Sequence, residues 1–237
     1  MGFLDKLGIG GSKQEREERG VRRLQKKTME KFGPPENRQG AIEALLMRYT
    51  IRVDPGITDD EEKQRILALV HEAGAPVSAE PVKAFILSRD EIAWPLKSLS
   101  DLLPEEEVVR FLIEVLRKTG TEYSRVPEKR VLLLHAAASH MSPEMVPVLL
   151  PFLDDMEDEV QIAAAQALAA QKDERAREPL LKRFLSAHEG SNARVREALA
   201  GILADTGFDV KGYTPRVEAA LPAAYRLDSK GRVVRKV

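Results

Sequence analysis

The sequence contains no cysteine and few aromatic residues. The absence of cysteine excludes disulfide bonds, cysteine-ligated metal sites and thiol nucleophiles. Aromatic residues make up only 5% of the chain, against 43% for all hydrophobic residues, so the core must be built mainly from Leu, Val, Ile and Ala. Because Ala and Leu lead the helix-propensity scale, this composition favours closely packed helices. A chain without disulfides also predicts the cytoplasm as its compartment.

Long apolar runs and strand patterns are missing as well. No stretch approaches the ~20 consecutive apolar residues that a membrane-spanning helix requires. The initial run MGFLDKLGIGG is too short and has the wrong charge order for a signal peptide. No alternation rich in Val, Ile and Thr indicates a sheet. We therefore expect an all-α cytoplasmic protein without a transmembrane segment.

The net charge of −1 conceals an uneven distribution. Residues 1–31 hold nine Lys or Arg against five Asp or Glu, and residues 211–237 hold seven against two. The segment between them therefore carries a net charge of −10. Basic ends on an acidic body are typical of solvated tails, but they also favour contact with an acidic partner or an anionic lipid surface. Composition alone does not separate these interpretations.

Three segments repeat one pattern, in which a Val is followed five residues later by an Ala. They begin at Val131, Val160 and Val195, at offsets of 29 and 35 residues, and each continues as an apolar-striped helix. Each is followed by a second helical stretch that opens with Ser, Asp or Thr beside Pro or an acidic residue, as helix N-termini do. The second stretches are expected over 145–153, 176–185 and 217–225.

Helix start and stop signals continue upstream with weaker internal similarity. They predict helices over about 13–31, 41–49, 58–73, 78–86, 92–103 and 104–116. Together with the three C-terminal pairs, these make about six antiparallel helix pairs. Repetition at this period indicates an α-solenoid, in which each pair buries its apolar stripe only against its neighbours.

The segment PFLDDMEDEVQIAAAQALAAQKDERAREPLLKRF (151–184) resembles a HEAT repeat of the short, phycobilin-lyase-like type. The matching features are Leu153, an Asp in the turn, Val160, the cluster of Ala165, Ala167 and Leu168, and Pro179-Leu180-Leu181. The resemblance is specific for residues 127–205 and extends over about 13–225. It implies a right-handed superhelix of antiparallel helix pairs, a protein-binding role and a bacterial source.

Three regions follow from these patterns. We expect a flexible N-terminal segment over residues 1–12, a HEAT-like solenoid over 13–225 and a basic C-terminal tail over 226–237. The stacking predicts one concave and one convex face, each lined by one set of helices.

No motif of catalysis or metal binding is present. The histidines at 71, 135, 140 and 188 lack ligand spacing such as HExxH. The acidic clusters at 59–62, 105–107 and 154–159 stand at expected helix starts, where each carboxylate contributes ~0.3–1 kcal/mol, and they lack the ladder of a calcium loop. We therefore predict no catalytic residue, no cofactor, no metal and no enzymatic activity.

Candidate partner-binding residues are those that the repeat itself does not require. The single tryptophan either packs on the preceding repeat or anchors a partner. Two aspartates in the turn before the 160s helix form an acidic strip if the turns align along one edge. Four basic residues near the C-terminus belong either to a polar cap folded back on the last repeat or to a contact with an acidic groove. The candidates are Trp94, Asp155, Asp158, Arg226, Arg232, Arg235 and Lys236.

The expected partner is another protein, bound on the concave face. Nucleic acid, bound as in the HEAT-like DNA alkylation-repair glycosylases, is disfavoured because the body is acidic and has few aromatic residues. A bilin-lyase-like accessory role rests on the repeat subtype alone. Membrane-surface contact through the termini is compatible with protein binding.

Overall fold

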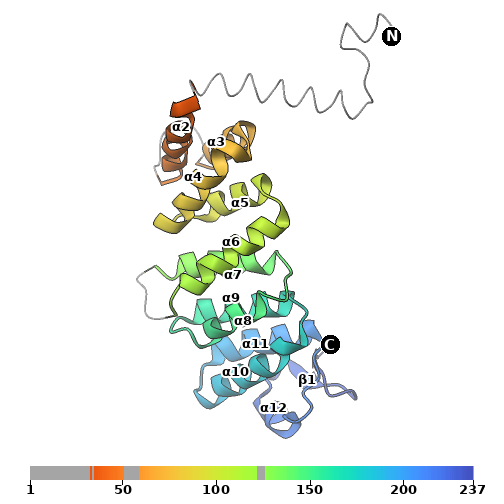
Figure 1. The fold of residues 1–237 in the computed structure, drawn as a ribbon. Helices are drawn as coiled ribbons and strands as arrows, with labels where there is room; N and C mark the ends of the chain where they lie inside the picture. The colour runs from red at the N-terminus through yellow and green to blue at the C-terminus, as the bar shows by residue number, and fades with distance from the viewer. Residues whose placement is uncertain (1–32, 34, 51–58, 122–125, 237) are drawn as a thin grey trace, which may run out of the picture. The chain divides into compact units, whose positions relative to one another are not determined.

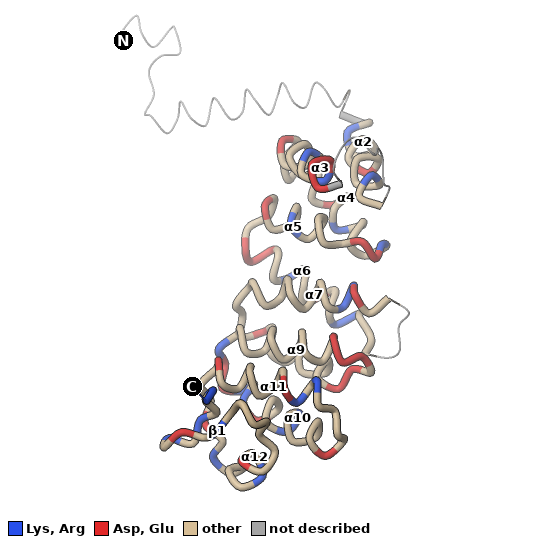
Figure 2. Tube along the Cα trace, turned by 180° about the vertical axis from the view of Figure 1, so that it is seen from behind, with Lys and Arg blue, Asp and Glu red and all other residues tan. Residues whose placement is uncertain are grey.

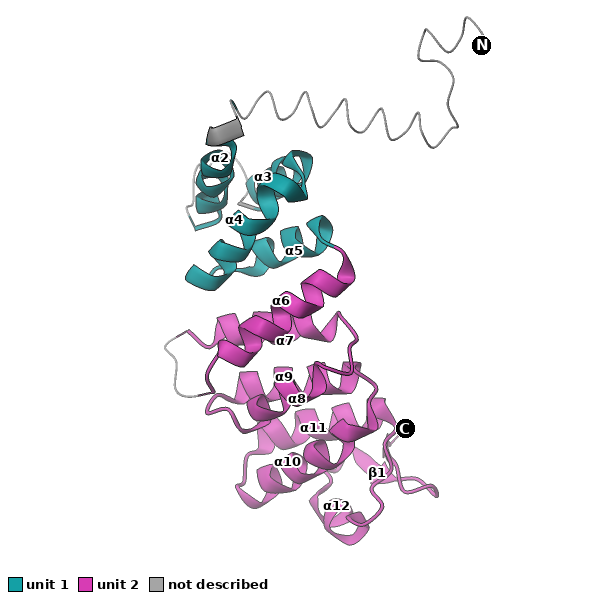
Figure 3. Cartoon of the chain, in the orientation of Figure 1, with its two compact units in different colours: residues 1–103 teal, residues 104–237 magenta. Residues whose placement is uncertain are grey.

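The computed structural model describes residues 33, 35–50, 59–121 and 126–236 (Figure 1). Eleven α-helices, three 3-10 helices and one two-stranded sheet lie within these ranges. The chain divides into two compact units, residues 1–103 and residues 104–237 (Figure 3). The expected segment 1–12 and the expected helix over 13–31 lie outside the described residues. The helices have the all-α architecture of paired, packed helices predicted for a solenoid.

Unit 1 contains four helices and a 3-10 turn. These are α2 (Pro35–Met47), η2 (Arg48–Thr50), α3 (Asp59–Ala73), α4 (Ala75–Ser88) and α5 (Ala93–Leu102). Helix α2 packs on α4 and α3 packs on α5, so alternate helices of the chain share a layer. The core between the layers is aliphatic, and its fully buried members include Ile42, Leu46, Ile66, Ile86 and Leu99.

Helix α4 begins earlier than the sequence predicts. Ser78 is the expected start, but the first helical residue is Ala75, with Gly74 (φ 82°) before it. Pro76 lies in the first turn, where the missing N–H has no intrahelical acceptor in any case, so the proline suits this start. Ser78 is buried inside the helix, and its hydroxyl donates to the Val70 carbonyl over 2.9 Å. The serine thus joins α4 to α3 and does not cap the helix.

Unit 2 holds the repeats that the sequence predicts best. Its helices are α6 (Glu105–Lys118), α7 (Glu128–Ala138), α8 (Val146–Leu149), η3 (Leu150–Asp154), α9 (Asp158–Ala170), η4 (Glu174–Ala176), α10 (Arg177–Glu189), α11 (Ala193–Thr206) and α12 (Thr214–Ala220). Helices α7, α9 and α11, the first helices of their pairs, lie side by side in one layer. The second helices, α6, α8 with η3, α10 and α12, form the other layer.

Helix α9 lies in the middle of the first-helix layer because its side chains are small. Ala163, Ala164, Ala165 and Ala167 are each at most 1% exposed, since α7 packs on one side of the helix and α11 on the other. The charged residues of α7 and α9 lie toward the helix ends, and the middle of α9 carries none (Figure 2). Alanine therefore supplies both the helix propensity and the close approach of three neighbouring helices.

The second helix of the α7 pair is short because of its prolines. The stretch expected over 145–153 forms the four-residue helix α8 and then continues as the 3-10 helix η3. Pro147 fits in the first turn of α8, but Pro151 has no N–H to donate back to the preceding turn. The α-helical hydrogen-bond ladder therefore ends at Leu150, and the chain tightens into η3.

The last predicted helix is wrong at its C-terminal end. It is expected to reach Tyr225, but α12 ends at Ala220, and Pro222 follows. Strand β1 (Tyr225–Leu227) pairs antiparallel with β2 (Val233–Arg235), with Tyr225 opposite Arg235. The expectation that the chain contains no sheet is therefore also wrong here. Strands of three residues are too short to show an alternating pattern.

A tight turn joins these two strands. The Asp228 carboxylate accepts the backbone N–H groups of Lys230 and Arg232 at 2.9 Å each, and Gly231 takes a left-handed φ of 70°. Strand β2 packs on α11. The hairpin thus covers α11, which is the last of the first helices in unit 2.

Candidate functional site

A buried ion pair joins the α7 repeat to the α9 repeat. The Arg130 guanidinium lies 3.1 Å from the Asp155 carboxylate, with side chains 6% and 0% exposed. Arg130 also donates to the Gly120 carbonyl over 3.2 Å, and Asp155 accepts the Glu157 N–H over 3.0 Å. Burial raises the pKa of Asp155, opposed by the Glu157 hydrogen bond and by the positive charge of Arg130. Asp155, a predicted surface contact, lies in the interior and presents no carboxylate to a partner.

The second acidic candidate, Asp158, is engaged by the next repeat. Its carboxylate accepts a hydrogen bond from the Asn192 side-chain amide over 2.8 Å. Asn192 in turn caps α11, because its Oδ1 accepts the Val195 N–H over 3.1 Å. The neighbouring Glu159 forms an ion pair with Arg194 of α11. The acidic first turn of α9 therefore connects α9 to α11, and it is not an isolated acidic strip.

Two of the four basic candidates are paired within the hairpin and its support. Arg232 contacts the Asp228 carboxylate at 3.0 and 2.8 Å, and Arg235 contacts Asp205 of α11 at 2.6 and 3.1 Å. Hydrogen bonding to these arginines contributes to lowering the pKa of each aspartate. These contacts favour the interpretation of the C-terminal residues as a cap folded back on the last repeat.

The other two basic candidates lie on the opposite face of the hairpin. Arg226 is opposite Val234 in the strand register, whereas Tyr225 and Arg235 occupy the alternate positions that approach α11. Lys236 directly follows β2 and is exposed, as is Arg226. These two side chains are therefore available to solvent.

Trp94 lies in the first turn of α5 and is half-buried. Its ring stacks on Tyr49 of η2 with centroids 6.4 Å apart and an interplanar angle of 14°. The Lys97 ammonium lies 5.4 Å from the same ring centroid. The tryptophan thus packs within unit 1, and these contacts support packing over a role as a fully exposed anchor.

Two of the histidines are paired with charged side chains. The Nδ1 atom of His140 lies 2.7 Å from the Glu105 carboxylate, and that of His188 lies 3.1 Å from the Arg196 guanidinium. In the described ranges, no three His, Cys, Asp or Glu side chains are arranged to hold a metal ion. Nor is any helix in those ranges long and apolar enough to cross a bilayer.

The exposed faces of neighbouring second helices in unit 2 carry three stripes of side chains. The members of the α6 and α10 stripes are three or four residues apart, so they lie on one side of their helix. The three exposed prolines of the middle stripe are four residues apart, with Pro143 in the turn before α8, Pro147 in α8 and Pro151 in η3. The stripe on α6 is charged, the middle stripe consists of prolines, and the stripe on α10 is again polar or charged. Their members are Glu107, Arg110, Glu114 and Arg117; Pro143, Pro147 and Pro151; and Glu178, Lys182, Ser186 and Glu189.

This proline stripe was not predicted from the sequence. Prolines beside capping residues were interpreted only as signals of helix starts, and this interpretation does not predict whether their rings are exposed. The regular spacing of four residues between these prolines is the sequence signal that could have identified them as a group. An apolar centre flanked by polar and charged residues is the composition typical of a protein-binding surface.

The gap between the C-terminal ends of α7 and α9 is filled by Gln171. This side chain is 9% exposed, and its amide nitrogen donates to the Ala137 and His140 carbonyls at 3.1 and 3.3 Å. Its amide oxygen accepts the Ser142 N–H over 2.9 Å. One side chain therefore satisfies three backbone groups at the end of the preceding repeat helix.

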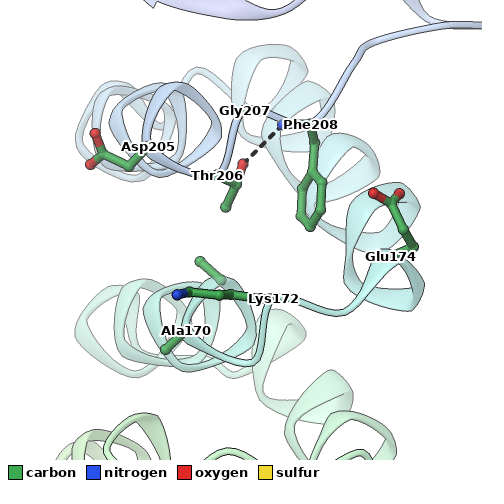
Figure 4. A pocket seen from close by; sticks show the side chains of 8 residues that line it. Ala170, Lys172, Glu174, Asp205, Thr206, Gly207 and Phe208 are labelled. Atoms are coloured by element: carbon green, nitrogen blue, oxygen red, sulfur yellow. Dashed lines mark hydrogen bonds between the residues drawn. The ribbon is translucent and has the colours of Figure 1, made fainter.

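The corresponding gap between α9 and α11 is an open pocket of about 500 Å³ (Figure 4). It is lined by Ala169, Ala170, Lys172, Glu174, Asp205, Thr206, Gly207 and Phe208. Unit 1 has a similar pocket of about 400 Å³ between the ends of α3 and α5, lined by residues that include His71, Gly74 and Asp101. No binding role was predicted from the sequence for the residues of the larger pocket.

A family model of HEAT repeats matches residues 109–204 and, overlapping them, residues 146–237. These matches cover more than half of the chain. The chain belongs to the HEAT-repeat family. The first match begins within α6, and the second includes the C-terminal hairpin of this HEAT-repeat protein. Searches among curated proteins and among solved structures found no match. HEAT repeats generally act as surfaces for protein interaction.

Proposed function

We propose that this HEAT-repeat protein is a non-catalytic, cytoplasmic scaffold that binds another protein on the exposed face of its second helices. The proline stripe between the two charged stripes of unit 2 carries this proposal. The proline rings offer apolar area that loses little conformational entropy on binding, because the side chains are already rigid. The flanking charges of both signs would set the orientation of the partner. The concave binding face expected from the sequence stays a prediction.

The distribution of internal contacts supports the same face. The acidic residues in the first turn of α9 join this helix to α11, and the hairpin covers α11 at the end of the first-helix layer. The proline stripe, by contrast, is exposed and makes no side-chain hydrogen bond, since proline has no polar side-chain atom. A surface that needs no rearrangement before contact suits a scaffold.

Placing two charges on the proline stripe is expected to abolish partner binding without unfolding the protein. The variant is Pro147→Lys with Pro151→Lys, and the matched control is Gln166→Lys with Glu197→Lys on the exposed side of α9 and α11. Affinity capture from a native cytosolic extract, followed by mass spectrometry, should show at least a tenfold loss of the specific partner only for the proline variant. A loss of this size corresponds to ~1.4 kcal/mol or more. Circular dichroism should show unchanged helicity for both variants.

Two results would contradict this proposal. Equal recovery of the partner by the proline variant and by the control would place the binding surface elsewhere. Turnover of a substrate by the purified protein, with no specific partner captured, would overturn the non-catalytic assignment.

A further inference from the structure

The two faces of the C-terminal hairpin differ in character. Side chains alternate between the two faces of a strand, and directly paired residues of neighbouring strands share a face. The register therefore places on one face Tyr225, Leu227, Val233 and Arg235. This inner face packs on α11, since Val233 is 1% exposed and the ends of the Tyr225 and Arg235 side chains lie close to Gly201. The outer face points away from α11.

The outer face carries two positive charges side by side. Arg226 lies opposite Val234, and the ladder continues beyond the strands, because the Lys236 N–H donates to the Ala224 carbonyl over 2.8 Å. Arg226 and Lys236 are therefore diagonal neighbours, which lie ~7–8 Å apart in an antiparallel pair. Both are exposed, and the half-buried Val234 lies next to each of them. Lys and Arg also gather along the hairpin in Figure 2.

The three aspartates that adjoin the hairpin are each paired with another arginine. The pairs are Asp205–Arg235, Asp209–Arg177 and Asp228–Arg232. Within the part of the chain that the structure describes, no acidic side chain is paired with Arg226 or Lys236. The outer face therefore has a surplus of positive charge that the fold does not neutralise.

The separation of these two cations matches an extended peptide. A strand rises ~3.3 Å per residue, so alternate side chains, which point to the same side, are ~6.6 Å apart. Two acidic residues at alternate positions of an extended segment can therefore pair with Arg226 and Lys236 at the same time. Val234 offers apolar area to the methylene groups of these acidic side chains.

The same face is poorly suited to nucleic acid or lipid. Single-stranded nucleic acid is held by aromatic rings on which bases stack, but Tyr225 of the hairpin faces α11. Recognition of anionic lipid takes about four to eight clustered Lys or Arg, and a surface helix adds large apolar residues that enter the bilayer. The outer face offers two unpaired cations beside one half-buried valine. An acidic protein segment fits these features better.

We propose that the outer face of the hairpin binds an extended acidic segment of a protein partner, in which Asp or Glu at alternate positions pairs with Arg226 and Lys236. Charge complementarity of this kind steers association and sets the orientation of a partner. The surface is separate from the proline stripe. A peptide probe tests it without a captured partner, so its failure would leave the proposed scaffold face unaffected.

The test is an NMR titration of the full chain with an acetylated and amidated peptide of alternating Glu and Thr. At low salt, saturable shifts are expected at the backbone amides of residues 224–236, with a dissociation constant on the order of 1 mM. They should vanish in 1 M NaCl, where charges are screened within about 3 Å. A peptide of the same composition that repeats Glu-Glu-Thr-Thr should bind roughly fivefold more weakly, because it has no acids at alternate positions. Equal affinity of the two peptides, or shifts that persist at high salt, would overturn the proposal.

Two double variants separate the local contact from net charge. Arg226→Gln with Lys236→Gln should weaken the alternating peptide at least tenfold. The matched control, Arg65→Gln with Arg89→Gln, removes the same charge at two exposed positions of unit 1 and should bind as the wild type does. The Val233 amide, on the inner face, reports whether the hairpin stays folded. Unchanged binding by the hairpin variant, or an equal loss in the control, would contradict the assignment.

Two further probes distinguish a protein segment from other anions. Flotation with vesicles of phosphatidylserine and phosphatidylcholine should show no binding that depends on Arg226 and Lys236. A gel shift with single-stranded oligothymidylate should likewise show none. Binding of either probe that is lost in the hairpin variant, together with no saturable peptide titration, would overturn the assignment to a protein partner.

Discussion

Replacing Arg130 with methionine is expected to lower the free energy of unfolding by about 3–5 kcal/mol. The substitution keeps much of the aliphatic volume but leaves the Asp155 carboxylate buried without its positive partner. A buried charge that loses its countercharge has an effect of about this size, whereas exposed ion pairs contribute about 0–1 kcal/mol. Urea denaturation followed by circular dichroism measures the change. A loss below about 1 kcal/mol would mean that the pair is not desolvated in solution.

The decrease in the free energy of unfolding caused by Arg130→Met should depend on pH. Removing Arg130 removes one of the interactions that oppose the raised pKa of Asp155, so the folded-state pKa rises further in the variant. A group with a raised folded-state pKa contributes stability below its unfolded pKa, and this contribution is lost as pH rises through the folded pKa. The free energy of unfolding of the variant should therefore be closer to that of the wild type at pH 4 than at pH 7.

The double variant Arg130→Met with Asp155→Asn is the control for this pair. It removes both charges, and the asparagine Oδ1 retains an acceptor for the Glu157 N–H. The free energy of unfolding should fall less in this double variant than the sum of the decreases in the two single variants, because neither buried charge is left without its partner. Additive losses would contradict direct coupling between the two side chains.

The second large effect is expected for Gln171→Leu, which should lower the free energy of unfolding by about 2–3 kcal/mol. Leucine has nearly the same size but withdraws the amide from the His140 carbonyl and the Ser142 N–H, where each buried group left unsatisfied costs about 1–3 kcal/mol. Some of this loss is offset by the apolar surface that leucine buries. Thermal unfolding and urea denaturation both measure it.

Gln166→Leu on the same helix is the matched control. Gln166 is exposed on α9, so its substitution should change the free energy of unfolding by no more than about 0.5 kcal/mol. If the two leucine variants were equally stable, the amide of Gln171 would not join the α7 and α9 repeats as described.

Sequence patterns predicted the helices of unit 2 well where local signals and burial agree. The Val and Ala positions of α7, α9 and α11 lie in these helices. The expected start signal at Asp173 caps η4, which leads into α10, because the Asp173 side chain accepts the Arg175 N–H. Two of the helix ends that were predicted wrongly involve prolines. At α4 the first-turn Pro76 sets the start in place of Ser78, and near α12 the chain turns into a hairpin after Ala220.

The candidate residues were predicted less well, because their partners are distant in sequence. Asp155 belongs to a cluster of acidic residues, and only the fold brings Arg130 of the preceding repeat to it. The same is true of Arg235 and Asp205, which are joined by the fold of the hairpin onto α11.

Hydroxyl-radical footprinting of the captured complex tests the proposed binding face most directly. Side-chain labelling is suited to this question because the helix amides are hydrogen-bonded with or without a partner. Pro147 and Pro151 should lose labelling on complex formation, whereas the exposed Met156, in the loop before α9, should be labelled equally in the free and bound protein. Unchanged labelling of the two prolines in a saturated complex would contradict the assignment of the second-helix face as the scaffold surface.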